Sequence, residues 1–388
     1  GSSVNVGDGV QVSVGLGGLI GINLTFAPTG TIDGGAAGTN TLILQNPIGL
    51  GGGTTGTGTA SSATYVNFNN LTLNSGTWTL QGPLVSGATT LNGGVAQFND
   101  NAAFGSGVLT SNGGILQASN AGLTLANQIN LGAGGLTLQG INGTTLNGVI
   151  SGSGGLTKIG SGQLNLNGIN TYTGNTVLNG GVVLVGNNQS FSTGGITVGG
   201  SSSISATTPI SLANAITLNS TLTATGTGAL TLGGVISGAA NLTKTGSGSL
   251  TLNGSNTYTG ITSLSAGTLR VGNNNALGTG VLNTSNGTSL DSTGNVTLAN
   301  NVGITGALNV LGSNALTLSG IVSGTGAITK SGSASLTLTG NNTNSGTTAL
   351  NGGSLLVGSN TALGTGALNA AAGTTLDATT AVTLANAV

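Results

Sequence analysis

Few residues in this sequence could carry acid–base, nucleophilic or metal chemistry. Among 388 residues there are five acidic and four basic side chains, and no histidine or cysteine. Enzymes that cleave polysaccharides cluster carboxylates with other polar groups around the scissile bond, and the sequence offers no such cluster. We therefore expect no catalytic, cofactor-binding or metal-binding residue. The ionisable candidates are Asp8, Asp33, Asp100, Asp291, Asp377, Lys158, Lys244, Lys330, Arg270, Tyr65, Tyr172 and Tyr258.

The acidic residues and the lysines have simpler interpretations than catalysis. Asp291 and Asp377 are 86 residues apart at equivalent repeat positions, which predicts stacked positions and no acid–base pair. Asp8 and Asp33 each precede glycine, as in Asp-Gly turns. Calcium-binding solenoids need an aspartate in nearly every nine-residue repeat, which is absent here. The lysines that end each Leu/Ile-Thr-Lys motif are predicted to be solvated turn residues.

Two polar patterns leave alternatives open. Tyr172 and Tyr258, in Asn-Thr-Tyr-Thr-Gly, could stack on sugars at an exposed turn, but an aromatic side chain covering the coil below is favoured. Thr-x-Thr pairs at 171/173 and 257/259 resemble ice-binding faces, which require such a pair on every coil of a flat face. In the sequence the pair recurs once per repeat, which argues against that function.

The lysines also mark a long internal repeat. Lys158, Lys244 and Lys330 are each separated by 86 residues, and residues 235–302 match 321–388 at 39 of 68 positions without a gap. A fixed long period indicates an array of stacked units. We expect an N-terminal β segment at 1–63, acting as a cap or first coils, and a β-helix at 64–388. Its repeats are placed at 64–148, 149–234, 235–320 and 321–388, the last incomplete.

The composition predicts an all-β parallel solenoid. Gly is 77 of 388 residues, hydrophobic residues are 37%, and Leu-x-Leu runs alternate apolar and polar positions, as in strands with one buried side. Coils of roughly 20 residues would number about 18 and form a rod on the order of 85 Å long at ~4.8 Å per coil. Leu164, Leu250 and Leu336 should point inward along one line.

The low charge limits which partners the protein can bind and how strongly its stability can depend on pH. A net charge of −1 and four cations cannot supply the clustered phosphate contacts of nucleic-acid binding. Few charges contribute to folding and no buried ionisable site is expected, so stability should change little between pH 4 and 9. Near the N-terminus, alternation from Val4 to Val14 predicts strands, whereas residues 51–62 read as a loop.

The repeated motif resembles a known family. Residues 155–187 and 240–273 follow the pattern G-x-L-T-K-x-G-x-G-x-L-x-L-x-G-x-N-T-Y-T-G with a later N-G-G-x-L-x-V-G-N, in part or whole. This resembles the autotransporter-associated β-strand repeat of bacterial passenger domains. In the third copy Asn344 replaces the tyrosine. The resemblance implies a right-handed parallel β-helix that is exported through the outer membrane and displayed or released at the cell surface.

These observations together predict a non-catalytic extracellular structural or adhesive rod of a bacterium: a surface stalk, an adhesin or a fibre subunit of a biofilm. The alternatives are a carbohydrate-active enzyme or an ice-binding surface on a β-helix. Expected partners are further copies of the chain, joined end to end, and host or matrix surfaces. No nucleic acid or small-molecule substrate is expected.

Overall fold

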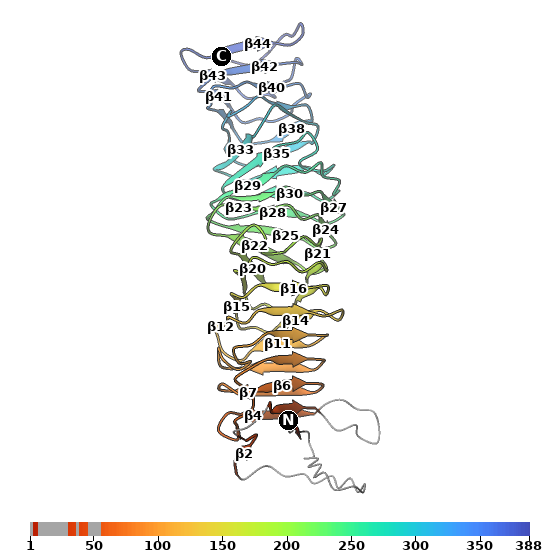
Figure 1. Ribbon diagram of the computed structural model, residues 1–388. Coiled ribbons are helices and arrows are strands. Elements are labelled where there is room, and N and C mark those ends of the chain that lie inside the picture. Colours follow the sequence, from red (N-terminus) through yellow and green to blue (C-terminus); the bar gives the residue numbers. More distant parts are fainter. Residues whose placement is uncertain (1–2, 7–29, 36–38, 46–55) are drawn as a thin grey trace. The chain divides into compact units, whose positions relative to one another are not determined.

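The computed structural model describes residues 3–6, 30–35, 39–45 and 56–388 (Figure 1). In these ranges the chain forms short strands joined by turns, without a helix, and the strands pair in parallel. The chain divides into two compact units, residues 1–194 and 195–388, with about 16 turns of a parallel β-solenoid in total. The predicted fold is confirmed. The predicted count of about 18 coils is slightly higher than the number of turns in the structure.

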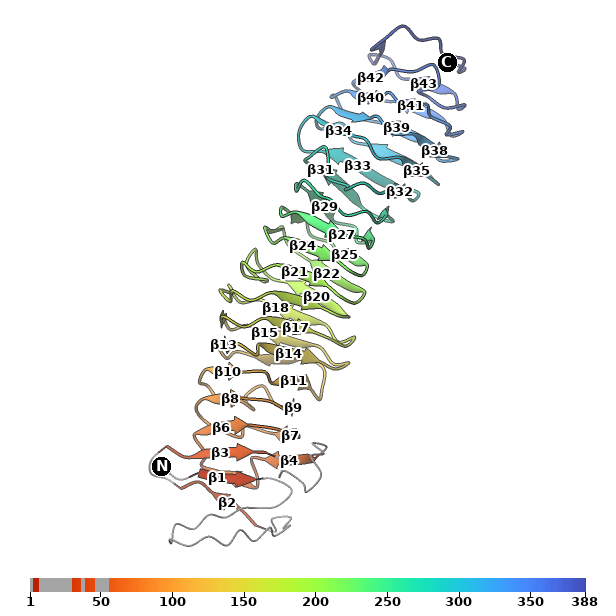
Figure 2. The ribbon, with the colours of Figure 1, turned by 90° about the vertical axis from the view of Figure 1, so that its right-hand side faces the viewer.

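In the first unit three successive strands make one turn, and the next turn stacks on them. Figure 2 shows this stacking for β6, β8, β10 and β13. One side of the unit consists of β1 (Ser3–Val6), β3 (Thr41–Leu44), β6 (Asn70–Leu73), β8 (Thr89–Leu91), β10 (Leu109–Ser111), β13 (Ile129–Leu131) and β16 (Ile150–Gly152). The second consists of β4 (Thr57–Ser61), β7 (Thr77–Gln81), β9 (Val95–Phe98), β11 (Ile115–Ala118), β14 (Leu136–Gln139), β17 (Leu156–Lys158) and β19 (Thr176–Leu178). The third consists of β12 (Leu123–Leu125), β15 (Thr144–Leu146), β18 (Leu164–Leu166) and β20 (Val182–Val185), and β2 (Ile32–Asp33) pairs separately with β5 (Tyr65–Val66).

The second unit repeats this plan with four sets of stacked strands. The first set is β21 (Ile196–Val198), β24 (Ile216–Leu218) and β27 (Ile236–Gly238). The second set is β22 (Ser202–Ala206), β25 (Leu222–Gly226), β28 (Leu242–Lys244), β30 (Thr262–Leu264), β32 (Leu282–Thr284), β35 (Val302–Ile304) and β38 (Val322–Gly324). The third set is β23 (Ile210–Leu212), β26 (Leu230–Leu232), β29 (Ser249–Leu252), β31 (Thr268–Val271), β33 (Thr288–Ser292), β36 (Leu308–Val310), β39 (Ile328–Lys330), β41 (Thr348–Leu350) and β43 (Leu368–Ala370). The fourth set is β34 (Val296–Leu298), β37 (Leu316–Leu318), β40 (Leu336–Leu338), β42 (Ser354–Val357) and β44 (Thr375–Ala378).

Alternation along each strand produces the core. In a strand successive side chains point to opposite sides, so the two leucines of Leu-x-Leu point inward while the middle residue faces solvent. Leu316 and Leu318 are 1% and 0% exposed, whereas Thr317 between them is partly exposed. Fully burying one such leucine contributes about 1.5–3 kcal/mol. The core is therefore a stack of apolar layers, one per turn.

The 86-residue repeat is longer than four turns. In the second unit Leu242 pairs with Thr262 in the next turn, and this column ends at Val322, four turns and 80 residues later. Ile328, the repeat counterpart of Leu242, comes six residues after Val322 and lies in β39, which belongs to a different sheet. Equivalent positions of successive repeats therefore move to the next side of the solenoid.

This shift corrects one prediction. Leu164, Leu250 and Leu336 point inward as expected and are at most 1% exposed. They do not form one line, because Leu250 lies in β29 and Leu336 in β40, strands of different sheets. In the first unit Trp78 of β7 and Leu164 of β18, also 86 residues apart, differ in the same way.

The expectations for the N-terminal region are only partly tested. Val4 and Val6 lie in β1, but Asp8 and residues 10–14 are outside the described residues. The loop predicted at 51–62 is wrong for Thr57–Ser61, which form β4 and pair with β7. Gly58 allows this pairing, because a Cβ there would lie 2.5 Å from the ring of Trp78.

Equivalent positions of successive repeats lie on neighbouring sides of the solenoid, and we call this the one-side shift. It predicts the distances between spin labels placed on this cysteine-free chain. Labels at Thr243 and Ser323 should be separated by four coils, ~19 Å between attachment points. Labels at Thr243 and Thr329 are 86 residues apart on different sheets and should be farther apart. Pulsed electron paramagnetic resonance measures both distances. If the 243/329 pair proved the closer one, equivalent repeat positions would stack directly and the shift would be wrong.

Candidate functional site

The three repeat lysines are buried, which overturns the prediction that they are solvated turn residues. Each is the last residue of its strand, two positions after an inward Leu156, Leu242 or Ile328, so that it also points inward. Lys158 and Lys244 are 3% exposed and Lys330 is 0% exposed. The alternation that places leucine in the core therefore places lysine there as well.

Backbone carbonyl groups receive each ammonium group. The Nζ atom of Lys158 donates to the carbonyl oxygens of Ile159 at 2.9 Å and Gly160 at 2.7 Å, and of Gly180 at 3.5 Å. The Gly180 contact joins residues 22 apart in sequence, in the turn of the next coil. Each lysine thus connects the turn after its own strand to the turn above.

The other two lysines make equivalent contacts. Lys244 Nζ donates to the carbonyl groups of Gly246 and, at 3.3 Å, of Ala266. Lys330 Nζ donates to Gly332 at 2.5 Å and to Gly352 at 3.1 Å. The same bridge therefore occurs in all three copies of the motif.

These ammonium groups have no carboxylate partner in the contacts of the described chain. Burial without a counter-charge disfavours the protonated form, and it lowers the pKa of Lys158 and of Lys244 to about 8. Burial also lowers the pKa of Lys330. Close approach requires glycine in the upper turn: a Cβ on Gly267, whose φ is +73°, would lie 2.9 Å from Lys244 Nζ. The lysine and the glycine-rich turns therefore depend on one another.

Three inward asparagines make a second bridge between coils. Asn170 accepts a hydrogen bond from the Ile150 N–H at 2.8 Å and donates to the Ser190 carbonyl at 2.7 Å, and these partners lie 20 residues before and after it. Asn256 and Asn342 make the equivalent contacts with the neighbouring coils. The segment around each asparagine is not a regular strand, so the side-chain amide supplies pairing there. These asparagines were not predicted from the sequence, although the fixed position of two of them, two residues before Tyr172 and Tyr258, was a signal.

Tyr172 and Tyr258 are core residues and present no ring to solvent. Both are 0% exposed, and each phenol oxygen lies 2.6 Å from a threonine hydroxyl, of Thr176 and Thr262 respectively. Burial raises the pKa of each tyrosine to about 12, partly offset by the threonine hydrogen bond. Sugar stacking on these two rings is therefore excluded by their position.

The third copy lacks this tyrosine–threonine pair. Asn344 replaces the tyrosine and is 1% exposed, and Thr348 takes the threonine position with 1% exposure. Neither the amide atoms of Asn344 nor the Thr348 hydroxyl has a hydrogen-bond partner within the described chain. Leaving buried polar groups unpaired costs about 1–3 kcal/mol each, so this is the weakest layer of the three equivalent ones.

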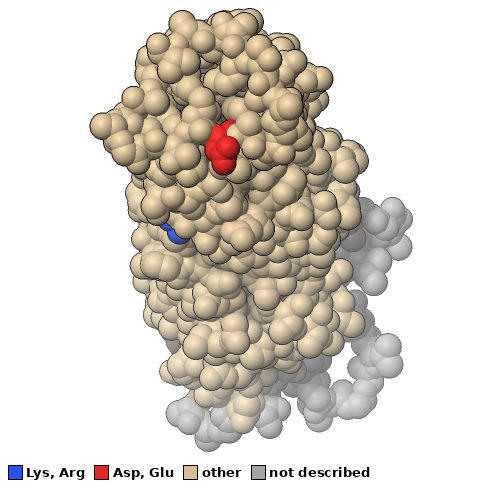
Figure 3. Space-filling view, turned by 90° about the horizontal axis from the view of Figure 1, so that it is seen from above, with Lys and Arg blue, Asp and Glu red and all other residues tan. Residues whose placement is uncertain are grey.

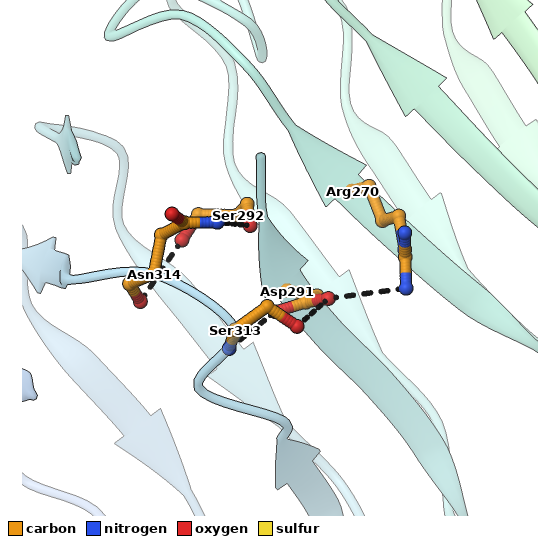
Figure 4. A network of polar contacts seen from close by, with 5 residues as sticks. All are labelled: Arg270, Asp291, Ser292, Ser313 and Asn314. Atoms are coloured by element: carbon orange, nitrogen blue, oxygen red, sulfur yellow. Dashed lines mark hydrogen bonds and ion pairs between the residues drawn. The ribbon is translucent and has the colours of Figure 1, made fainter. Parts of the chain in front are cut away.

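One ion pair is present among the described residues. Arg270 Nη2 lies 3.4 Å from Asp291 Oδ2, and Ser313 donates to the same carboxylate through its backbone N–H and its hydroxyl (Figure 4). Asp291 is 1% exposed. Its repeat counterpart Asp377 lies in another sheet, β44, opposite Leu356, and is exposed. The prediction that the two aspartates stack on each other is therefore wrong, because the repeat shifts by one side.

The remaining candidates in the described part of the chain form no reactive cluster. Asp33 and Asp100 accept hydrogen bonds from backbone N–H groups two residues ahead, at 2.8 Å each, as in Asx turns. The Gly35 N–H, and then the Asn67 amide, lower the pKa of Asp33. Burial raises the pKa of Tyr65. No group of three or more potential acidic metal ligands occurs among the described residues.

The described surface has little charge and includes a sizeable cavity beside Tyr65. Figure 3 shows a face that is almost entirely uncharged, with one acidic group and a trace of basic surface. The cavity, of about 720 Å³, is lined by uncharged residues that include Ser62, Tyr65, Asn67 and Leu84. No helix in the described part of the chain is long and apolar enough to span a membrane.

Comparison with protein families assigns the motif that carries these bridges. The passenger-associated-transport-repeat family matches residues 156–185, 242–271 and 328–357. These three segments are similar to passenger-associated-transport repeats and are called transport repeats below. The match confirms the resemblance to autotransporter passenger domains with repeats. No curated protein sequence matches the chain significantly. No solved structure does so either.

Each transport repeat contains both the buried lysine and the backbone carbonyl groups that this lysine contacts. The first begins with Leu156 of the lysine strand and ends at Val185, so it includes Lys158 and all three of its carbonyl partners. It also includes Tyr172 and Thr176. Each matched segment of 30 residues therefore corresponds to a physical unit of about one and a half coils, closed by a lysine bridge.

The buried lysines and tyrosines predict a stability maximum near pH 10. The unfolded chain has lysine pKa values of about 10.5 against about 8 in the fold, so it binds more protons and stability rises from pH 8 to 10.5. Tyrosine pKa values rise from 10 to about 12 on folding, so stability falls above pH 10. Urea unfolding at each pH measures this curve.

Substitution of the lysines supplies the control. In Lys158→Met/Lys244→Met/Lys330→Met the rise between pH 8 and 10 should disappear, whatever the variant's stability at pH 7. A wild-type midpoint that falls steadily from pH 8 to pH 10 would contradict this assignment. The expectation of constant stability up to pH 9 is no longer supported, because its premise of no buried ionisable group is wrong.

Restoring the tyrosine in the third transport repeat should stabilise the protein. Asn344→Tyr provides a phenol for the Thr348 hydroxyl and removes an unpaired amide, which predicts a gain of about 2 kcal/mol in the free energy of unfolding. The matched change Tyr258→Asn should cost about 3 kcal/mol or more. Chemical denaturation of both variants measures the difference. Destabilisation by Asn344→Tyr would mean that this layer has no space for the ring.

Proposed function

We propose that this chain is a non-catalytic structural or adhesive segment of a bacterial autotransporter passenger, displayed at the cell surface. The three transport repeats on a parallel β-solenoid carry the proposal. The passenger repeat family implies secretion of the protein to the cell surface, which supports an extracellular location. Adhesin, stalk and fibre subunit are the specific roles compatible with such a segment.

The chemistry of the described residues supports a role without catalysis. The polar groups of the repeats are used for contacts between coils: Lys158 with backbone carbonyls, Asn170 with two neighbouring coils, and Tyr172 with Thr176. The sizeable cavity has no ionisable acid or base other than the buried Tyr65 in its lining. A carbohydrate-active enzyme would need converging carboxylates, and no observation on the described residues favours it.

Turn-by-turn stacking suits a protein that folds after export. Each turn pairs with the turns before and after it, for example β28 with β25 and β30. Folding of such an array can start at one place and propagate. No charge network between distant parts of the sequence has to form first, and the single described ion pair joins adjacent strands.

End-to-end self-association is part of the same proposal. Each turn of the solenoid pairs through its backbone with the turns beside it, for example β41 with β39 and β43. The same backbone pairing between separate chains is the interaction that would join copies end to end.

Display of residues 1–388 on a heterologous autotransporter barrel tests the function. We expect the segment to be accessible to antibody on intact cells, to resist added protease, and to increase cell aggregation or attachment to matrix-coated surfaces. The control is the same barrel with a globular passenger, and electron micrographs of the purified chain report fibres. Retention in the periplasm would contradict the surface role, and accessible but non-adhering, non-aggregating cells would contradict the adhesive one.

A further inference from the structure

One side of the second unit carries two uncharged columns that are rich in hydroxyl groups. The side is the stack β22, β25, β28, β30, β32, β35 and β38, several of which are labelled one above another in Figure 2. From β22 to β35 an inward residue lies between two outward positions, the second of which follows the end of the strand from β28 onward. In β38 the exposed Gly324 takes the place of the inward residue. The residues at these two positions, from the first turn to the last, are Ser203/Ser205, Thr223/Thr225, Thr243/Thr245, Ser263/Ser265, Asn283/Ser285, Gly303/Thr305 and Ser323/Thr325.

The 20-residue turn creates this array. The sequence shows Thr-x-Thr once per repeat in the Asn-Thr-Tyr-Thr-Gly segment, and that spacing argues against a regular face. In the fold, different segments of the repeat reach the same side in successive turns, so that Thr223, Thr243 and Ser263 stack directly. A hydroxyl occurs at one or both outward positions on every turn of this stack.

The array is accessible and has no charged side chain. Its members are half-buried or exposed, and Thr245, Ser265 and Thr305 are among the exposed ones. Lys244, the one ionisable residue in these strands, points inward and is 3% exposed. Alongside runs a third column that includes Ile261, exposed by 40%, and Ile321, exposed by 43%. The side therefore combines hydroxyl groups with apolar groups.

The spacing of the array matches ordered water. Neighbouring turns repeat at ~4.8 Å and outward positions along one strand at ~6.7 Å. Tetrahedral water with hydrogen bonds of about 2.75 Å places second-neighbour oxygens about 4.5 Å apart and repeats at about 7.4 Å perpendicular to that direction. The spacings of the outward positions and of the water lattice therefore differ by roughly a tenth or less in each direction.

We propose that this side of the second unit binds the surface of ice. Hydroxyl groups fixed on a rigid β-stack present donors and acceptors at the repeat of the water lattice, so waters ordered on them continue into the crystal. Thr305 donates its own hydrogen to the Thr284 carbonyl at 2.9 Å, which leaves its oxygen as an acceptor. Fixing the hydroxyls in this way lowers the entropy cost of binding a regular surface.

Other extended surfaces fit this side less well. Crystalline polysaccharides are flat and hydroxylated, but sugars are bound largely by exposed aromatic rings. The described aromatic residues are all buried, at 3% exposure or less. Anionic membranes and nucleic acids require cationic side chains, and this array has none.

Ice-affinity partitioning of the purified 388-residue chain tests the proposal. We expect the chain to enter slowly growing polycrystalline ice, and Thr243→Tyr, which places a bulky ring in the middle of the array, to lower the incorporated fraction about tenfold. The matched control is Thr231→Tyr, at an outward position of β26 on a neighbouring side, which should behave as wild type. Circular dichroism checks that both variants remain folded.

Three results would overturn the proposal. The first is exclusion of the wild-type chain from ice to the same extent as a non-binding protein. The second is equal loss of incorporation in Thr243→Tyr and Thr231→Tyr, which would locate any binding elsewhere. The third is retention on crystalline cellulose or chitin together with exclusion from ice, which would make a polysaccharide surface the ligand.

Discussion

Hydrogen bonding between successive turns is the interaction on which the structure depends. Each turn is an open row of backbone donors and acceptors until the next turn covers it, and unpaired buried backbone groups are costly. Where three strands make a turn, main-chain pairing alone satisfies these groups. Where one side departs from strand geometry, as around Asn170, the side-chain amide bonds to the coil on either side. The buried polar residues of the repeat thus complete a network that the backbone leaves open.

The same constraint explains why a lysine can occupy the core. An isolated buried ammonium is expensive, but the turns on either side of each lysine present carbonyl oxygens that glycine-rich backbone leaves uncovered. Lys330 reaches two such carbonyls, of Gly332 and Gly352. Replacing the lysine with an apolar residue would leave these acceptors without a donor. The charge is therefore tolerated because the turns need a donor as much as the ammonium needs acceptors.

The sequence predicted the fold well, and it predicted side-chain environments less well. Alternating Leu-x-Leu runs and the fixed period were sufficient for a parallel solenoid, because both follow from local strand geometry. The placement of Lys158 failed because the hydrophobic pattern was applied to leucine and not to the lysine two positions later. The stacking of Asp291 and Asp377 failed for a different reason: it depends on residues per turn, and 86 is not a multiple of the 20-residue turn seen from Leu242 to Thr262. That number is set by how tightly each corner turns, which the sequence does not state directly.

Buried polar residues also help to fix the register of the strands in a solenoid whose strands have similar sequences. Strands of similar Leu-x-Leu sequence can pair in more than one register, and register is weakly specified where neighbouring strands resemble each other. A slip of one turn between Leu242 and its partners would still bury leucines. It would not bring the Ala276 carbonyl beside the Asn256 amide, or the Ala266 carbonyl beside the Lys244 ammonium group, where the observed hydrogen bonds form. Misregistered turns would therefore leave a buried amide or ammonium unpaired, at a cost of about 1–3 kcal/mol or more each. By this argument the few polar residues of the core select one stacking order among many that apolar burial alone would allow.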